Sequence, residues 1–332
     1  MIGSSIKCKV KRLSYYIVNL FFVILLPIFM FLPASVLSQM DLSRVQEFDS
    51  EGNFITSWGV NGTGAGQFLH IHGIALDTKG NLLAADEEKN EVQKFDENGN
   101  FITSWGSEGK GPGQFSSKIE DITVDSEDNV YVVDYGNNRI QKFADDGTFI
   151  KTWGEKGSEL GQFDRPWGVA FDSQYVYVTD RENHRVQKFD TNGTFISGWG
   201  SNGTSSGQFL KPAGVVVDMT EGVYVVDEGK NEVQKFDRDG NFITSWGSKG
   251  KAVGQFNEPH GISVDSTGNI YVADTGNTRI QKFNPQGEYI ESWGVIGVGD
   301  GEFLFPSDVA VNPIDSTVFV SDQKFQHPEK NF

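Results

Sequence analysis

Six positions that recur every 46 to 48 residues carry side chains of different types, while the sequence around them repeats: His72, Glu120, Trp167, Ala213, His260 and Ser307. Trp167 stands out because every other tryptophan of the chain belongs to the repeated pattern. An indole can stack on a sugar ring or on a side chain. We therefore expect His72, Glu120, Trp167, His260 and Ser307 to form a ligand-binding ring. The alternatives are a solvated rim that varies without function, and a Trp167 that only fills space.

The repeat that positions these residues is marked by three landmarks in one register. The first is a Trp-Gly dipeptide, with spacings of 47, 48, 46, 47 and 47 between Trp58, Trp105, Trp153, Trp199, Trp246 and Trp293. The second is Gly-Gln/Glu-Phe, which ends at Phe68, Phe115, Phe163, Phe209, Phe256 and Phe303. The third is an aspartate that ends an apolar run: Asp86, Asp134, Asp180, Asp227, Asp274 and Asp322.

Each unit predicts four short strands joined by turns. In the second unit the strands are expected at 121–124, 130–133, 139–143 and 148–153, with turn residues such as Asp145-Asp146-Gly147 between them. The second strand is apolar at consecutive positions, which indicates burial on both faces. Four-stranded units of this length, repeated without helices, are typical of propeller blades, so the predicted fold is an all-β propeller.

The ends of the repeat region predict how the ring closes. Residues 44–58 supply only the third and fourth strands of a unit, and residues 308–321 supply only the first and second. Pairing these two halves gives a sixth blade and leaves no exposed edge between the chain ends. We therefore predict six blades within residues 41–322, with residues 323–332 as a C-terminal tail surplus to the ring.

The first 38 residues are expected to direct export. Lys7, Lys9, Lys11 and Arg12 precede an apolar run from Tyr15 to Leu32, and Val36 and Ser38 suit the −3 and −1 positions of a signal-peptidase site. The apolar run is also long enough to span a bilayer. A cleaved signal peptide and a retained signal anchor both remain open, and either makes the protein secreted or otherwise extracytoplasmic. The anchor would be its only contact with a membrane.

Charge and cysteine content exclude several function classes. Residues 1–38 contain four of the 28 Lys and Arg and none of the 45 Asp and Glu, so the remainder carries a net charge of −21. Nucleic-acid binding depends on Lys and Arg, so nucleic acid is not an expected partner. Cys8 is the only cysteine, which excludes disulfides, a zinc ribbon, a RING domain and a cysteine nucleophile from the rest of the chain.

Residues 259–283, PHGISVDSTGNIYVADTGNTRIQKF, resemble the NHL repeat, and the resemblance extends over about residues 41–322. NHL propellers occur in ubiquitin-ligase scaffolds, RNA-binding repressors, kinase sensor domains and peptidyl-amidoglycolate lyases, so the resemblance implies a fold and leaves function to the site. We expect a monomeric, non-catalytic propeller that presents its channel face and glycine-rich loops to a protein, peptide or glycan. Binding of this kind requires no cofactor.

The alternative is a metal-dependent lyase or hydrolase that resembles the amidoglycolate lyases. That resemblance implies zinc held by histidines on alternate blades, here His72 and His260, with Tyr135 as a base and Arg181 on a substrate carboxylate. The third histidine position is Trp167, which departs from the pattern. Calcium is the other metal to consider, because sequences such as Asp96-Glu97-Asn98-Gly99 resemble calcium loops. They recur at every connection of this kind, and tight hairpin turns are the better interpretation.

Overall fold

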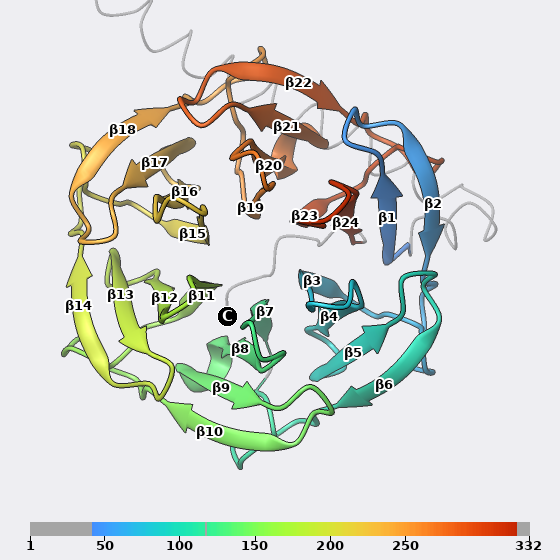
Figure 1. Ribbon diagram of the computed structural model, residues 1–332, viewed down its shortest axis with the longest axis horizontal. Coiled ribbons are helices and arrows are strands. Elements are labelled where there is room, and N and C mark those ends of the chain that lie inside the picture. Colours follow the sequence, from blue (N-terminus) through green and yellow to red (C-terminus); the bar gives the residue numbers. More distant parts are fainter. Residues whose placement is uncertain (1–41, 117, 324–332) are drawn as a thin grey trace, which may run out of the picture. The chain divides into compact units, whose positions relative to one another are not determined.

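The computed structural model describes residues 42–116 and 118–323, which form six four-stranded antiparallel sheets around a central axis (Figure 1). The predicted all-β, six-bladed propeller is confirmed. Its innermost strands, one from each blade, surround the axis: β3 (Ile71–Leu76), β7 (Ile119–Val124), β11 (Pro166–Phe171), β15 (Pro212–Val217), β19 (Ile262–Val264) and β23 (Pro306–Val311). The outermost strands form the perimeter: β6 (Phe101–Trp105), β10 (Phe149–Trp153), β14 (Phe195–Trp199), β18 (Phe242–Trp246), β22 (Tyr289–Trp293) and β2 (Phe54–Trp58).

The second and third strands of each blade lie between these two layers. The second strands are buried along almost their whole length, as their consecutive apolar residues predict: β4 (Leu82–Asp86), β8 (Val130–Asp134), β12 (Tyr175–Asp180), β16 (Val223–Asp227), β20 (Ile270–Asp274) and β24 (Val318–Asp322). The third strands complete the sheets: β5 (Glu91–Phe95), β9 (Arg139–Phe143), β13 (Arg185–Asp190), β17 (Glu232–Phe236), β21 (Arg279–Phe283) and β1 (Arg44–Phe48).

The sixth blade closes the ring by joining the two ends of the repeat region. Its sheet has the order β2-β1-β24-β23, and β1 pairs with β24 from Arg44 opposite Asp322 to Phe48 opposite Val318. The predicted pairing of N-terminal and C-terminal strands is therefore confirmed.

The repeated Trp and Phe rings pack directly against the repeated glycines, both between and within blades. A side chain at these glycine positions would overlap the rings. A Cβ atom placed on Gly193, in the turn between β13 and β14, would lie 2.5 Å from Cδ2 of Trp153 in the preceding blade. A Cβ on Gly154 would lie 2.5 Å from the ring of Phe163. Equivalent contacts recur in all six blades, so the spacing of these residues follows from how the blades pack.

The aspartate that ends each second strand holds the loop that enters its blade. Asp134 is fully buried, accepts the backbone N–H of Ser116 at 3.2 Å and pairs with Nε of Arg139 at 2.7 Å. The guanidinium of Arg139 also donates to the carbonyls of Gly111 and Gln114, in the loop between β6 and β7. The aspartate and the arginine therefore form an ion pair that holds this loop against the blade.

Two blades achieve the same bonding with lysine. In the first blade Lys89 pairs with Glu91 and donates to the carbonyls of Gly64 and Gln67, at the places that the arginine reaches in the second. Lys230 does the same in the fourth blade with Glu232. A lysine three residues after the strand-ending aspartate and an arginine five residues after it therefore donate to equivalent carbonyls.

The boundaries differ from the predicted ones by one or two residues. Strand β7 begins at Ile119 rather than at 121, because Ile119 pairs with Asp134 across an irregularity before Ile122. Two 3₁₀ turns, η1 (Tyr135–Asn137) and η2 (Thr275–Asn277), were not predicted. Within the described ranges there is no helix of the length and hydropathy that crossing a bilayer requires. The predicted export segment 1–38 and all of the predicted tail except Gln323 lie outside the described residues.

Candidate functional site

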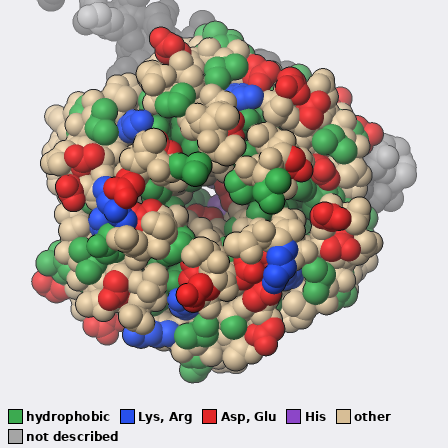
Figure 2. All heavy atoms as spheres, in the orientation of Figure 1, with side chains coloured by type: hydrophobic (Ala, Val, Ile, Leu, Met, Phe, Trp, Pro, Cys, Tyr) green, Lys and Arg blue, Asp and Glu red, His purple; other side chains and the backbone are tan. Residues whose placement is uncertain are grey.

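The innermost strands enclose a central cavity of about 300 Å³ that His72, Glu120, Trp167, His260 and Ser307 help to line. Figure 2 shows the central opening on one face, with hydrophobic side chains around its rim and histidine visible inside. Each ring residue stands at or next to the start of an innermost strand, so the predicted ring does converge on the axis. The structure thus brings together side chains that are about 47 residues apart in the chain.

Three of these side chains meet across the channel. The Trp167 ring lies edge-on to His72 and His260, with centroid distances of 5.5 and 5.7 Å, and the two imidazoles stack with a centroid distance of 6.1 Å. They come from the first, third and fifth blades, so their mutual contact narrows the channel at this level. Trp167 is only partly buried and also packs against the core around Ala213. Trp167 therefore lines the cavity and packs against the core at the same time.

Glu120 is the most unusual group in the ring. Its side chain is 1% exposed, and neither carboxylate oxygen has a hydrogen-bond partner among the described residues. Its nearest polar neighbour is Nε2 of His72, at 3.3 Å from Oε2. Burial raises the pKa of Glu120 to about 7. A buried carboxylate without donors is costly in the charged form, so this position favours either a proton or a bound donor.

The orientation of the His72 ring determines which of its nitrogens faces the Glu120 carboxyl group. Nδ1 lies 2.7 Å from the backbone carbonyl of Glu120, and because a carbonyl only accepts, Nδ1 carries the hydrogen. In the neutral ring Nε2 then bears a lone pair, which faces the Glu120 carboxyl group. Burial lowers the pKa of His72, and His260 behaves in the same way, with its pKa lowered to about 3 by burial. Both imidazoles are therefore neutral near pH 7.

A second set of side chains surrounds the ring. Arg181 pairs with Glu228 and stacks its guanidinium on Trp167, with 4.2 Å from Cζ to the ring centroid. Nη1 of Arg181 and Nδ1 of His260 are buried and have no hydrogen-bond partner among the described residues, while Nε2 of His260 lies 3.6 Å from Glu228. Arg181 thus fills one face of the indole and keeps one buried donor for a ligand.

Tyr135 and Ser307 occupy less open positions than predicted for ligand-facing residues. Tyr135 lies edge-on to Trp167 at 6.0 Å between centroids, and burial raises its pKa, so the phenol stays protonated near pH 7 and does not readily accept a proton. Ser307 has no exposed surface, and its hydroxyl oxygen accepts a hydrogen bond from Gln323. Ser307 therefore contributes to the ring through this hydrogen bond and does not expose its hydroxyl group.

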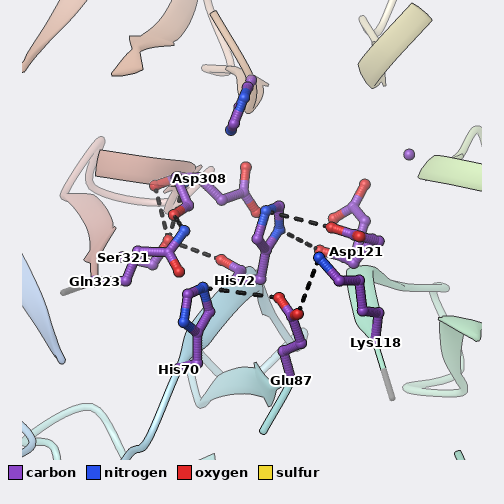
Figure 3. Close-up of polar contacts among 12 residues, drawn as sticks. His70, His72, Glu87, Lys118, Asp121, Asp308, Ser321 and Gln323 are labelled. Atoms are coloured by element: carbon purple, nitrogen blue, oxygen red, sulfur yellow. Dashed lines mark hydrogen bonds and ion pairs between the residues drawn. The ribbon is translucent and has the colours of Figure 1, made fainter. Parts of the chain in front are cut away.

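Glu87 and Lys118 belong to the site and were not predicted. Lys118 lies 3.2 Å from Glu87, which also approaches His70 at 3.7 Å (Figure 3). Burial raises the pKa of Glu87 to about 7. A sequence signal for this set did exist: the residue after each strand-ending aspartate varies as the ring does, as Glu87, Tyr135, Arg181, Glu228, Thr275 and Gln323. Only Tyr135 and Arg181 of these were singled out.

Asp121 and Asp308 were also missed, although they replace the glycine that follows the ring position in the other four blades. Their carboxylates accept backbone N–H groups of other blades, from Val169 at 2.8 Å and from Ile74 at 2.9 Å. Figure 3 shows His72 lying between these two aspartates. Burial raises the pKa of both, that of Asp308 to about 7. They join the blades beside the ring.

The residues present fit a three-histidine zinc site poorly. The third histidine position holds Trp167, whose indole offers no metal ligand, so only two of the three imidazoles are present. Nδ1 of His72 donates to a carbonyl, which leaves Nε2 as the nitrogen that a metal would use. Within the described ranges, the one set of three potential ligand atoms lying within 4.8 Å of each other belongs to Asp77, Asp128 and Asp145. Lys79 and Lys94 already pair with those carboxylates, which lie away from the ring.

Comparison with known proteins supports the fold. A family model described as NHL repeat matches residues 163–189 and 256–283, and one described as 6-bladed beta-propeller matches residues 78–154. No curated protein sequence matches the chain closely enough to count as a relative.

Solved structures that resemble the chain share the fold at low identity. A structural genomics protein of unknown function from Bacteroides thetaiotaomicron has 18% identity and a TM-score of 0.61, covering 84% of this chain and 76% of its own. Virginiamycin B lyase from Staphylococcus aureus has 15% identity and a TM-score of 0.55, covering 81% and 79%. A gluconolactonase from Xanthomonas campestris has 14% identity and a TM-score of 0.56, covering 78% and 88%. The family models and the observed blades together show that the chain contains NHL repeats and forms a six-bladed β-propeller.

Proposed function

We propose that the protein is a non-catalytic binding module that acts outside the cytoplasm and captures a protein, peptide or glycan at its channel ring. The observation that carries this proposal is the set of buried polar atoms without hydrogen-bond partners around a partly exposed Trp167: both carboxylate oxygens of Glu120, Nη1 of Arg181 and Nδ1 of His260. Unpaired buried polar atoms are rare in folded proteins, and a bound ligand is one way to satisfy them.

The same contacts favour binding over catalysis by the lyase alternative. The guanidinium of Arg181, which would hold a substrate carboxylate, pairs with Glu228 and stacks on Trp167. The phenol of Tyr135, which would act as a base, has a raised pKa. A proton acceptor works best when its pKa lies near the operating pH. Arg181 and Tyr135 both contact neighbouring side chains of the protein. These contacts would have to break before either group could act on a substrate.

Action outside the cytoplasm is supported by the sequence of the first 38 residues, with their basic start and apolar run. The net charge of −21 on the remaining residues favours solubility and attracts cationic rather than anionic ligands. Monomeric behaviour and freedom from any cofactor are part of the same proposal.

The test is a binding screen of the full chain on glycan and peptide arrays, repeated with Trp167→Ala. We expect at least one class of ligand to bind and Trp167→Ala to weaken it about tenfold or more, since a buried aromatic contact at a binding site contributes 2 kcal/mol or more, roughly. Met219→Ala is the matched control, because Met219 is 84% exposed in the turn between β15 and β16. Ligands that bind equally to all three proteins would contradict a site at Trp167.

A further inference from the structure

Glu120 is the one carboxylate beside the ring that has neither a Lys or Arg partner nor a hydrogen-bond donor among the described residues. Glu228 pairs with Arg181 and lies 3.5 Å from Lys211, and Glu87 pairs with Lys118 at 3.2 Å. The Glu120 carboxylate contacts His72, which supplies no charge when it is neutral, and Lys118 and Arg181 act on it only from beyond ion-pair distance. Five carboxylates thus stand beside the channel: two pair with cations, Asp121 and Asp308 accept backbone N–H groups, and Glu120 has neither kind of partner.

The pairing of Glu120 with His72 leaves a place for hydrogen-bond donors. Nδ1 of His72 donates to a carbonyl at 2.7 Å, so Nε2 presents a lone pair to Oε2 of Glu120 at 3.3 Å. Two acceptors at this separation repel each other unless something that donates to both is bound or one of them takes up a proton. The second carboxylate oxygen of Glu120 also lacks a donor. At least three acceptor positions therefore converge without donors among the described residues.

We propose that this pair binds a primary ammonium group carried on an alkyl chain, as in a lysine side chain or at the N-terminus of a peptide. One ammonium nitrogen carries three donors, enough for the imidazole nitrogen and the carboxylate together. Hydrogen bonds in which both partners are charged are the strongest of their kind. The inference rests on the proposed binding function, which it narrows to ligands that carry an amine.

The surroundings suit such a ligand. His72, Glu120 and Trp167 line the same cavity of about 300 Å³, whose walls include Ile74 and Ile122, so an alkyl chain has apolar surface to follow. Trp167 and Tyr135 add ring surfaces beside the charge, which attract a cation further. A ligand without charge would leave Glu120 unpaired, and an anionic one would be repelled by it.

The experiment is titration calorimetry of the full chain with four probes at pH 8: n-butylammonium, butan-1-ol, butyrate and tetramethylammonium. We expect n-butylammonium to bind, the alcohol and butyrate not to bind measurably, and tetramethylammonium, which has charge but no donors, to bind at least about tenfold more weakly. Zn²⁺ and Ca²⁺ are titrated in parallel, because stoichiometric metal binding abolished by Glu120→Gln, with no binding of the amine, would overturn the inference.

Variants tie the binding to the pair. Glu120→Gln keeps the shape of the side chain and removes a buried charge, so it should fold, and it should weaken n-butylammonium about ten- to hundredfold. Glu87→Gln should weaken it less, because Lys118 already neutralises that carboxylate. Glu97→Gln, an exposed change in the turn between β5 and β6, is the control and should have no effect. Equal binding to Glu120→Gln and to the control would overturn the inference.

Proton release gives a second readout. The ammonium group needs Glu120 ionised, so binding near pH 7 should release protons, and the affinity should rise with pH and level off above it. The charged and titratable groups around Glu120 that also contribute are Glu87, His72, Lys118, Asp121, Tyr135, Arg181 and Glu228. The Glu120→Gln variant should release fewer protons per bound ammonium than the parent chain, because one of the carboxyl groups that ionise is absent.

The outcomes separate this inference from the proposed function. If array ligands without an amine bind and depend on Trp167, while n-butylammonium does not bind, the channel is a binding site and the ammonium inference is wrong. If neither the arrays nor the amine give binding, both are wrong. If n-butylammonium binds with the expected dependence on Glu120, the array ligands should include amine-bearing peptides, and acetylation of their amines should abolish binding.

Discussion

Gly193, in the turn between β13 and β14, and Gly254, in the loop between β18 and β19, offer a pair of substitutions that isolates the packing between blades. Gly193 has a φ of +78° and Gly254 has a φ of +72°, so a Cβ strains the backbone at both positions to the same degree. At Gly193 a Cβ would lie 2.5, 2.7 and 2.7 Å from three ring atoms of Trp153. At Gly254 it would meet nothing within 4 Å. Alanine at these two positions therefore differs in contacts and in little else.

The magnitude follows from two contributions. An L-residue in the left-handed region costs about 1–2 kcal/mol, partly offset by the lower chain entropy of alanine in the unfolded state. This contribution is common to both variants. Contacts of 2.5–2.7 Å are about 1 Å closer than carbon atoms approach at their optimum. Trp153 is 9% exposed and contacts Tyr131 and Phe189, so it has little room to retreat. Overpacking of this kind costs roughly 1–3 kcal/mol.

The assay is urea unfolding of both variants and the parent chain, followed by far-UV circular dichroism. We expect Gly254→Ala to lower the unfolding free energy by about 1 kcal/mol and Gly193→Ala to lower it by a further 1–3 kcal/mol, roughly, with unchanged m-values. Equal effects at both positions would refute the argument that the Trp contact fixes the turn glycine. A larger effect at Gly254 would refute it more strongly.

Three further predictions concern the site. Because burial raises the pKa of Glu120 from 4.5 to about 7, the folded state holds a proton that the unfolded state releases. The unfolding free energy should therefore fall between pH 5 and pH 8, and Glu120→Gln should remove up to about 3 kcal/mol of that fall, measured by chemical denaturation at each pH. Trp167→Ala should cost about 2 kcal/mol, less than a fully buried tryptophan, and should lower the melting temperature without unfolding the chain at 25 °C; a variant that does not fold would show Trp167 to be core. Elemental analysis of the purified protein should find no stoichiometric zinc, and zinc that disappears in His72→Ala would make the lyase alternative the better one.

The fold could be predicted from the sequence because each repeat contains the local features that specify its strands and turns. The glycines of the tight turns, the apolar second strands and the Trp-Gly landmarks are local features, and their recurrence fixes the number of blades. The incomplete units at 44–58 and 308–321 predicted the closing blade, since two half-sheets with unpaired edges have one arrangement that leaves no edge exposed.

The ring was predicted in outline and not in its chemistry. Variation at equivalent positions identified His72, Glu120, Trp167, His260 and Ser307, and the structure brings them to one channel. The same criterion applied to the residue after each strand-ending aspartate would have added Glu87 and Glu228. It could not have shown that Ser307 faces Gln323 or that Arg181 stacks on Trp167. Those contacts depend on side-chain directions at the axis.

The sequence alone determined the architecture, its acidic charge and the positions at which six blades differ. Periodicity and turn residues act over a few neighbouring residues, so they are legible without coordinates. The tertiary structure alone decided which of the varied side chains pair with which, and that Glu120 is left without a donor or a cation while Glu87 and Glu228 each have one. Residues about 47 apart in the chain meet only where six strands converge. Burial at that place makes the charged form of Glu120 costly unless a ligand donates hydrogen bonds to it.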